Sequence, residues 1–188
     1  MKKKKKAAKN AIVLTKDNIS SLIAIAAALL NILALLFALV DATQEFRTET
    51  ERHFANGFSL IFGECPMAIE SYANLFKFAC VCHLIVAAFV IALVCARLLA
   101  KRKLSLGKTG VAAVVISAIF TTVYFILGFI AYAEATAYGG IGYGYSASTF
   151  AFIPFALMVI AVASYILVRV KLPDGYRFVI KKKHRKDK

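Results

Sequence analysis

Cysteines and a histidine are the residues of this sequence that could do chemistry in apolar surroundings. Cys80, Cys82, His83 and Cys95 fall within one apolar run, and Cys65 precedes it. Membrane thiol oxidoreductases rely on Cys-x-x-Cys pairs. Cys80 and Cys82 are only two residues apart, which puts their sulfurs about 200° apart around a helix. We expect the thiols to be buried and inert, with a disulfide between Cys65 and Cys80 as the alternative.

His83 is the only ionisable residue well inside an apolar run. An intramembrane ionisable group points to function by default, so a proton or ion pathway is one interpretation. A neutral imidazole that hydrogen-bonds a neighbouring helix is the other, and it is the one we expect. His53 and His184 lie outside the apolar runs, and the sequence has no zinc, phosphate-loop or serine-hydrolase motif. We therefore predict no cofactor, no metal and no catalytic residue.

A short glycine- and tyrosine-rich stretch bears on ion conduction. Residues 140–144 read Gly-Ile-Gly-Tyr-Gly, one residue away from the Thr-Val-Gly-Tyr-Gly filter of potassium channels, whose carbonyls replace the hydration shell of the ion. Such a filter follows a pore helix, whereas only "EATAYG" separates this stretch from an apolar run, and Gly140 replaces the threonine. We predict a turn anchored at the membrane interface by Tyr138, Tyr143 and Tyr145.

Four apolar runs are long enough to cross a membrane, which takes about 20 residues. They cover 19–40, 75–99, 111–133 and 149–170. A soluble domain of 188 residues could not bury so apolar a composition, with a mean hydropathy of +0.73. The first run also exceeds the roughly 7–15 residues of a signal-peptide core. We predict an all-α integral membrane protein, an antiparallel four-transmembrane-helix bundle.

The charges between the runs predict its orientation. The segments 1–18, 100–110 and 171–188 are basic, whereas the connections 41–74 and 134–148 carry an excess of acids. Positively charged segments stay in the cytoplasm, so we expect both termini there and the protein in the plasma membrane. The basic segments should also attract anionic inner-leaflet lipid. They are short and juxtamembrane, so we expect no nucleic-acid partner.

Small and polar residues recur along single faces of the first and third runs. In the first run they are spaced four and three residues apart, as Ser20, Ala24, Ala27, Asn31, Ala34 and Ala38. Such residues let helices approach closely in lipid, and Asn31 needs a hydrogen-bond partner there, for which Thr121 and Tyr124 are the candidates. Pro154 either starts or kinks the fourth helix. The candidates for helix packing or a polar interior are Asn31, Ala27, Ala34, Ser117, Thr121, Tyr124 and His83.

The connection 41–74 is longer than a simple helix reversal needs, which favours a role in recognition. We expect 41–56 to extend the first helix, and Phe58, Leu60 and Phe62 to form a short strand or an interfacial turn. In the C-terminal tail, 178–180 should lie along the inner leaflet beside basic residues. The outer recognition candidates are Phe58, Phe62, Cys65, Tyr143 and Tyr145.

These patterns favour a non-enzymatic accessory subunit or membrane organiser that acts through helix-packing and outer-loop contacts. Its expected partner is another protein or a second copy of the chain. A small oligomeric channel or transporter is the first alternative, and a membrane-embedded thiol or lipid enzyme is the second.

Overall fold

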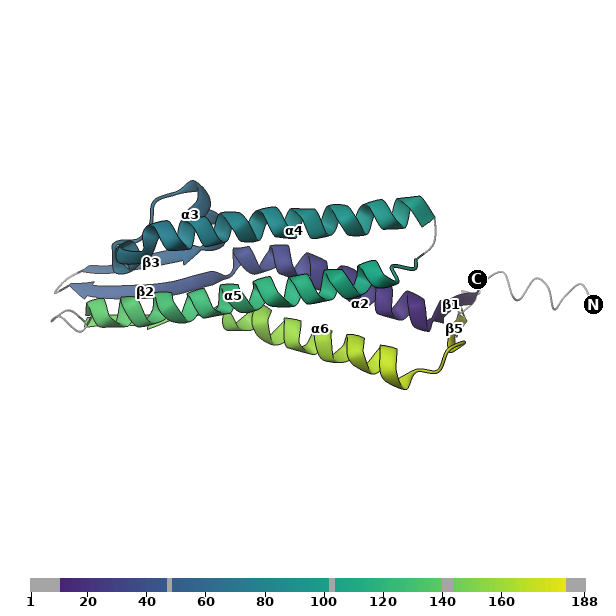
Figure 1. Ribbon diagram of the computed structural model, residues 1–188. Coiled ribbons are helices and arrows are strands. Elements are labelled where there is room, and N and C mark those ends of the chain that lie inside the picture. The colour runs from purple at the N-terminus through teal and green to yellow at the C-terminus, as the bar shows by residue number, and fades with distance from the viewer. Residues whose placement is uncertain (1–10, 47–48, 102–103, 140–143, 182–188) are drawn as a thin grey trace, which may run out of the picture.

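Four long helices run side by side, and a small antiparallel sheet lies at each end of the bundle (Figure 1). The computed structural model describes residues 11–46, 49–101, 104–139 and 144–181. Each of the four helices is long and apolar enough to cross a membrane. The helices are α2 (Lys16–Leu33), continued by the 3-10 turn η2 (Ala34–Leu36), α4 (Ala73–Lys101), α5 (Lys108–Gly139) and α6 (Phe152–Lys171), with the shorter α3 (Gly57–Phe62) and η3 (Met67–Tyr72) between β3 and α4.

The two sheets define the ends of the molecule. At the two-stranded end, β1 (Ala11–Thr15) pairs antiparallel with β5 (Arg177–Lys181). At the three-stranded end, β2 (Ala38–Phe46) lies between β3 (Glu49–Asn56) and β4 (Gly144–Ser148), and both pairings are antiparallel. The prediction of four helices that are long and apolar enough to cross a membrane is therefore confirmed, whereas the prediction of an all-α chain is wrong at both ends of the bundle.

The helices differ in length, and this difference positions the three-stranded sheet. The α2 and η2 segments together have 21 residues and α6 has 20, about 30 Å each at the helical rise of 1.5 Å per residue. In contrast, α5 has 32 residues and is about 48 Å long. It runs past the ends of α2 and α6, and the strands β2 and β4 lie along its extension (Figure 1).

Local sequence signals begin several elements. The Thr15 side chain caps α2 by accepting a hydrogen bond from the Asn18 amide at 3.3 Å. Asn56 and Ser59 form a reciprocal capping box that starts α3. Pro154 lies in the first turn of α6, where its missing N–H costs no helical hydrogen bond. Pro154 therefore lies at the start of α6 and not at a kink within it.

The predicted helical extension over 41–56 is wrong, because this segment forms β2 and β3. Its glutamates, glutamine and arginines favour a helix locally. The strands form because β2 also pairs with β4, a strand from a distant part of the chain. In this register Ala42 lies opposite both His53 and Ala147. The stretch containing Phe58, Leu60 and Phe62 is neither a strand nor an interfacial turn, since it forms α3.

The first helix packs against each of the other three long helices, α4, α5 and α6. The small residues of its seam face the interior, and Ala24, Ala27 and Ala34 are completely buried. The leucines on the opposite side of the first span are about half exposed, as expected for a surface that faces lipid. These leucines are Leu29, Leu33 and Leu36.

Gly128 allows α5 to pack closely against the start of α6. A Cβ atom at this position would lie 2.7 Å from the Ala151 Cβ and 2.8 Å from the Thr149 Oγ1. Both distances are shorter than van der Waals contact. The absence of a side chain at Gly128 therefore determines how near the β4–α6 connection can come to α5.

We predict that Gly128→Ala lowers the thermal unfolding midpoint of the protein in detergent. Alanine favours a helix over glycine by about 1 kcal/mol, but overpacking at this contact should cost about 1–3 kcal/mol. Ala112→Leu, which adds apolar atoms on the exposed side of α5, is the control and should leave the midpoint unchanged. A higher midpoint for Gly128→Ala would contradict the packing argument.

Candidate functional site

The first span changes from helix to strand over a few residues, between Leu33 and Ala38. A helix that ends leaves its last four carbonyl groups without intrahelical partners. In an apolar environment each such group needs another hydrogen-bond donor. Four donors from different segments of the chain reach main-chain carbonyls between Asn31 and Ala38, the last of which already belongs to β2. They are His83 to the Asn31 carbonyl, Tyr124 to the Phe37 carbonyl, the Asn56 side chain to the Leu36 carbonyl and the Phe150 amide to the Ala38 carbonyl.

His83 of α4 makes the deepest of these contacts. Its Nε2 lies 2.8 Å from the Asn31 main-chain oxygen. Because a carbonyl only accepts, Nε2 carries the proton. The ring stands edge to face against Phe120, at 5.8 Å between centroids, and against Tyr124, at 5.5 Å. The side chain is 2% exposed, so the imidazole is held between α2 and α5.

Tyr124 of α5 joins three segments through one hydroxyl group. It donates to the Phe37 carbonyl at 2.6 Å and accepts from the Gly57 amide at 2.9 Å. Gly57 can reach this position because it has no side chain, since a Cβ atom there would lie 2.4 Å from the Leu35 Cδ2. Tyr124 is completely buried. Its hydroxyl therefore ties the end of the first span and the start of α3 to α5.

Asn31, Thr121 and Ser117 continue the buried polar groups toward the two-stranded end. Thr121 donates through Oγ1 to the Asn31 Oδ1 at 3.4 Å. Ser117 lies one turn before Thr121 on α5, and all three residues are completely buried. Within the described part of the chain, the Asn31 Nδ2 and the Ser117 Oγ have no hydrogen-bond partner. We call Asn31, His83, Ser117, Thr121 and Tyr124 the polar cluster.

The structure therefore brings together five of the seven candidates for the interior, and the other two, Ala27 and Ala34, flank Asn31 on the same helix. Within the polar cluster, His83 and Tyr124 donate hydrogen bonds to main-chain carbonyls. This arrangement fits a structural role. The sequence predicted a structural hydrogen bond for His83, but it could not identify the acceptors, because they are backbone atoms.

The cysteines are free thiols, and Cys65 and Cys80 form no disulfide. Cys65 is partly buried, and its Sγ lies 3.7 Å from the Ile69 carbonyl oxygen. Burial, together with the nearby Glu70, raises the pKa of the Cys65 thiol and so makes it less reactive. Among the residues that the structure describes, no group of three or more His, Cys, Asp or Glu residues could hold a metal ion.

The outward face of the three-stranded sheet is the other candidate surface. Arg52 donates to Asp41 from Nε at 2.8 Å and from Nη2 at 2.5 Å, and this pairing lowers the pKa of the Asp41 carboxyl group. Thr43 and Ser146 share a hydrogen bond across β2 and β4 at 2.5 Å. Phe54, which lies opposite Asp41, is 49% exposed. We call Asp41, Thr43, Arg52, Phe54 and Ser146 the sheet platform.

Aromatic rings lie on the side of the sheet that faces α5. The rings of His53 and Tyr145 stack at 6.3 Å between centroids, and Tyr138 meets Tyr145 edge to face at 6.0 Å. The Tyr138 hydroxyl lies 3.1 Å from the Met67 sulfur. These contacts link β3, β4 and η3 to the extension of α5.

The outer recognition candidates therefore lie in different places. Phe58 is half-buried against the core, Phe62 is 78% exposed, and Tyr145 is turned toward α5. Tyr143 lies outside the described residues, as do residues 140–142 of the filter-like stretch, whereas its last residue, Gly144, begins β4. The residues of the sheet platform were missed, because the segment 41–56, which contains four of the five, has the residue types of a helix, and Ser146 lies in a segment predicted to be a turn. A comparison of the chain with family models, with curated proteins and with solved structures finds no match.

We predict that Tyr124→Phe destabilises the protein by about 2 kcal/mol or more. The substitution leaves the Gly57 amide and the Phe37 carbonyl unpaired, and each buried unsatisfied group costs about 1–3 kcal/mol. Denaturant unfolding in mild micelles measures the change. Tyr132→Phe, on the exposed side of the same helix, should change the stability by less than about 0.5 kcal/mol. Equal stabilities for the two variants would rule out this role of the hydroxyl.

Proposed function

We propose that this protein is a non-enzymatic accessory subunit or organiser of the plasma membrane that binds a protein partner through its three-stranded end. One observation carries the proposal. The strands β3 and β4 flank β2, and in the described residues neither has a further strand on its outer side. Exposed edge strands present free N–H and C=O groups and are common sites of pairing with another chain.

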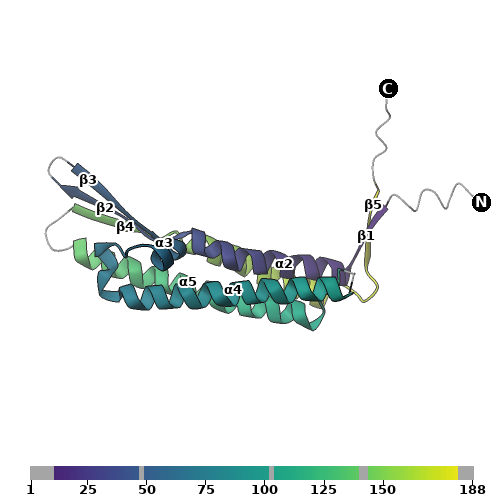
Figure 2. The same ribbon diagram turned by 90° about the horizontal axis from the view of Figure 1, so that it is seen from above.

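The position of the sheet supports the same function. The extension of α5 holds β2 and β4 beyond the ends of α2 and α6 (Figures 1 and 2). The sheet platform is polar apart from Phe54. Protein-binding surfaces often combine a polar rim with a few aromatic residues that contribute most of the binding energy. The small residues of α2, in contrast, are used within the chain's own bundle. The sheet is therefore more accessible to a partner than the α2 seam is.

The polar cluster gives less support to a channel. His83 and Tyr124 donate to main-chain carbonyls, and His83 is enclosed by Phe120 and Tyr124. A main-chain carbonyl has no proton of its own to pass on, so hydrogen bonds that end on carbonyls do not continue a proton relay. The interior therefore supports a rigid scaffold for the sheet, which is what an accessory subunit needs.

The charges support an orientation with the two-stranded end in the cytoplasm. We predict that a membrane-impermeant maleimide labels Glu49→Cys in intact cells more strongly than it labels the native chain. Arg177→Cys should gain labelling only after the membrane is permeabilised, because Arg177 lies in β5 at the other end. The reverse pattern would show that the three-stranded end is cytoplasmic and would contradict the proposed orientation.

We predict that Phe54→Ser weakens the complex with the partner by about tenfold or more, as expected for loss of an aromatic anchor. Native mass spectrometry of complexes purified from native membranes in a mild detergent measures the fraction of chain that is bound.

The matched control is Phe178→Ser. Phe178 is 50% exposed, close to the 49% of Phe54, but it lies at the two-stranded end. It should leave the bound fraction unchanged. An equal loss with both variants, or no loss with Phe54→Ser, would count against the sheet platform as the binding surface.

A further inference from the structure

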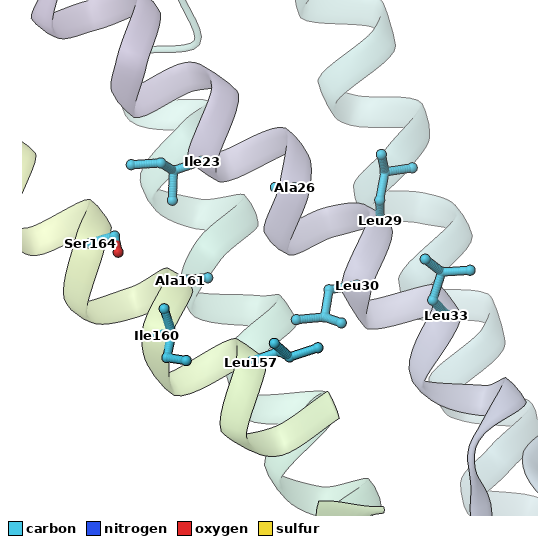
Figure 3. Close-up of a pocket in the computed structure, with 9 residues that line it drawn as sticks. All are labelled: Ile23, Ala26, Leu29, Leu30, Leu33, Leu157, Ile160, Ala161 and Ser164. Carbon is cyan, nitrogen blue, oxygen red and sulfur yellow. The ribbon is translucent and has the colours of Figure 1, made fainter. Parts of the chain in front are cut away.

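An apolar groove of about 490 Å³ runs between α2 and α6 on the outside of the bundle. Figure 3 shows its two walls, with Leu30 of α2 directed toward Leu157 of α6 and with Ala26 and Ala161 leaving space between the helices. The groove is lined by Ile23, Ala26, Leu29, Leu30, Leu33, Leu157, Ile160, Ala161 and Ser164. Of these side chains only Ser164 is polar, so the groove fits a hydrocarbon chain.

The two helices that form the groove also carry the two-stranded sheet. The strand β1 leads directly into α2, and the chain that leaves α6 returns as β5. Figure 2 shows that β1 and β5 run across the direction of the helices. The sheet therefore lies roughly parallel to the plane of a membrane that the helices cross. Val13, Phe178 and Val179 of this sheet are 43–50% exposed, as expected at a lipid interface.

Basic residues gather at this end of the groove. Lys16 pairs with Asp174 at 2.9 Å and Arg169 pairs with Asp17 at 3.3 Å, and these ion pairs fix the start of α2 to the end of α6 and the turn after it. Lys171 ends α6, and Arg177 lies opposite Thr15 in the sheet. Neither Lys171 nor Arg177 has an ion-pair partner in the part of the chain that the structure describes. Two unpaired cations thus lie at the polar end of an apolar groove.

We propose that the α2–α6 groove binds one anionic phospholipid. One acyl chain lies between Ala26 and Ala161, and the phosphate group lies near Lys171 and Arg177. Lys16 is ten residues from Ala26 and Lys171 is ten residues from Ala161, about 15 Å along each helix at the helical rise, so a glycerol backbone fits between the chain and the phosphate. This inference is independent of the partner proposed for the three-stranded end.

The groove between α5 and α6 provides an internal comparison. It is smaller, at about 280 Å³, and it includes Ala118 and Ala163. The α5 side of this groove does not continue into the two-stranded sheet, because α5 begins at Lys108 after the turn from α4. The α2–α6 groove therefore differs from the α5–α6 groove, because only the former continues into the two-stranded sheet and its basic residues.

The experiment measures lipid retention by the full chain in detergent with native mass spectrometry. Palmitoyl-oleoyl phosphatidylglycerol and phosphatidylcholine, which share their acyl chains, are added separately. We expect one phosphatidylglycerol to be retained preferentially. The double variant Lys171→Gln, Arg177→Gln should bind it about thirtyfold more weakly, the effect of two charges near an anionic group. Its retention of phosphatidylcholine should not change.

Variants that fill the groove test the position of the acyl chain. Ala26→Leu should reduce retention of both lipids, and Ser164→Leu repeats the test from the other helix. Ala163→Leu, in the α5–α6 groove, should leave retention unchanged. Equal retention of the two lipids by the native chain, or no effect of either filling variant, would overturn the proposal. A dimer that Ala26→Leu dissociates would also overturn it, since the occupant would then be a second copy of the chain.

Discussion

The structure depends on how the main-chain carbonyls at the end of the first span are satisfied. A membrane helix can stop and become a strand only where other groups donate to the carbonyls that it releases. His83 and Tyr124 do so from two neighbouring helices. Tyr124 also receives the Gly57 amide, which fixes the start of α3. The same few hydrogen bonds thus hold the helices together and set the point at which the sheet begins.

The sequence was sufficient to predict the four spans and the inward face of α2, because both follow from patterns that are local in the chain. Asn31 needed a partner in lipid, and Thr121, one of the two residues proposed, donates to its Oδ1, whereas its Nδ2 has no partner among the described residues. The role of His83 was predicted only in kind, since its acceptor is a backbone oxygen that any residue at position 31 would offer. The strands could not be predicted. The β2–β4 pairing joins Asp41 to Ser148, and no local preference reports a contact across that separation.

The two ends of the bundle have different physical properties. The three-stranded end lies along the extension of α5. Its outward face carries the Arg52–Asp41 ion pair, the Thr43–Ser146 hydrogen bond and the exposed ring of Phe54. The two-stranded end lies across the helices and combines exposed apolar side chains with Lys171 and Arg177, which have no ion-pair partner among the described residues. These properties are the basis of the two proposals, a protein partner at the three-stranded end and an anionic lipid at the two-stranded end. The buried polar cluster separates the two ends and keeps the helices between them in a single arrangement.

The length of α5 has a mechanical consequence. It is one helix from the turn after α4 to the strands that it supports, and it contains no proline. Such a helix lacks the proline at which helices often kink. When a bilayer becomes thicker or thinner, its helices respond by tilting. A tilt of α5 would therefore move the sheet sideways as a rigid body, so that the thickness of the membrane is converted into the position of the sheet above it.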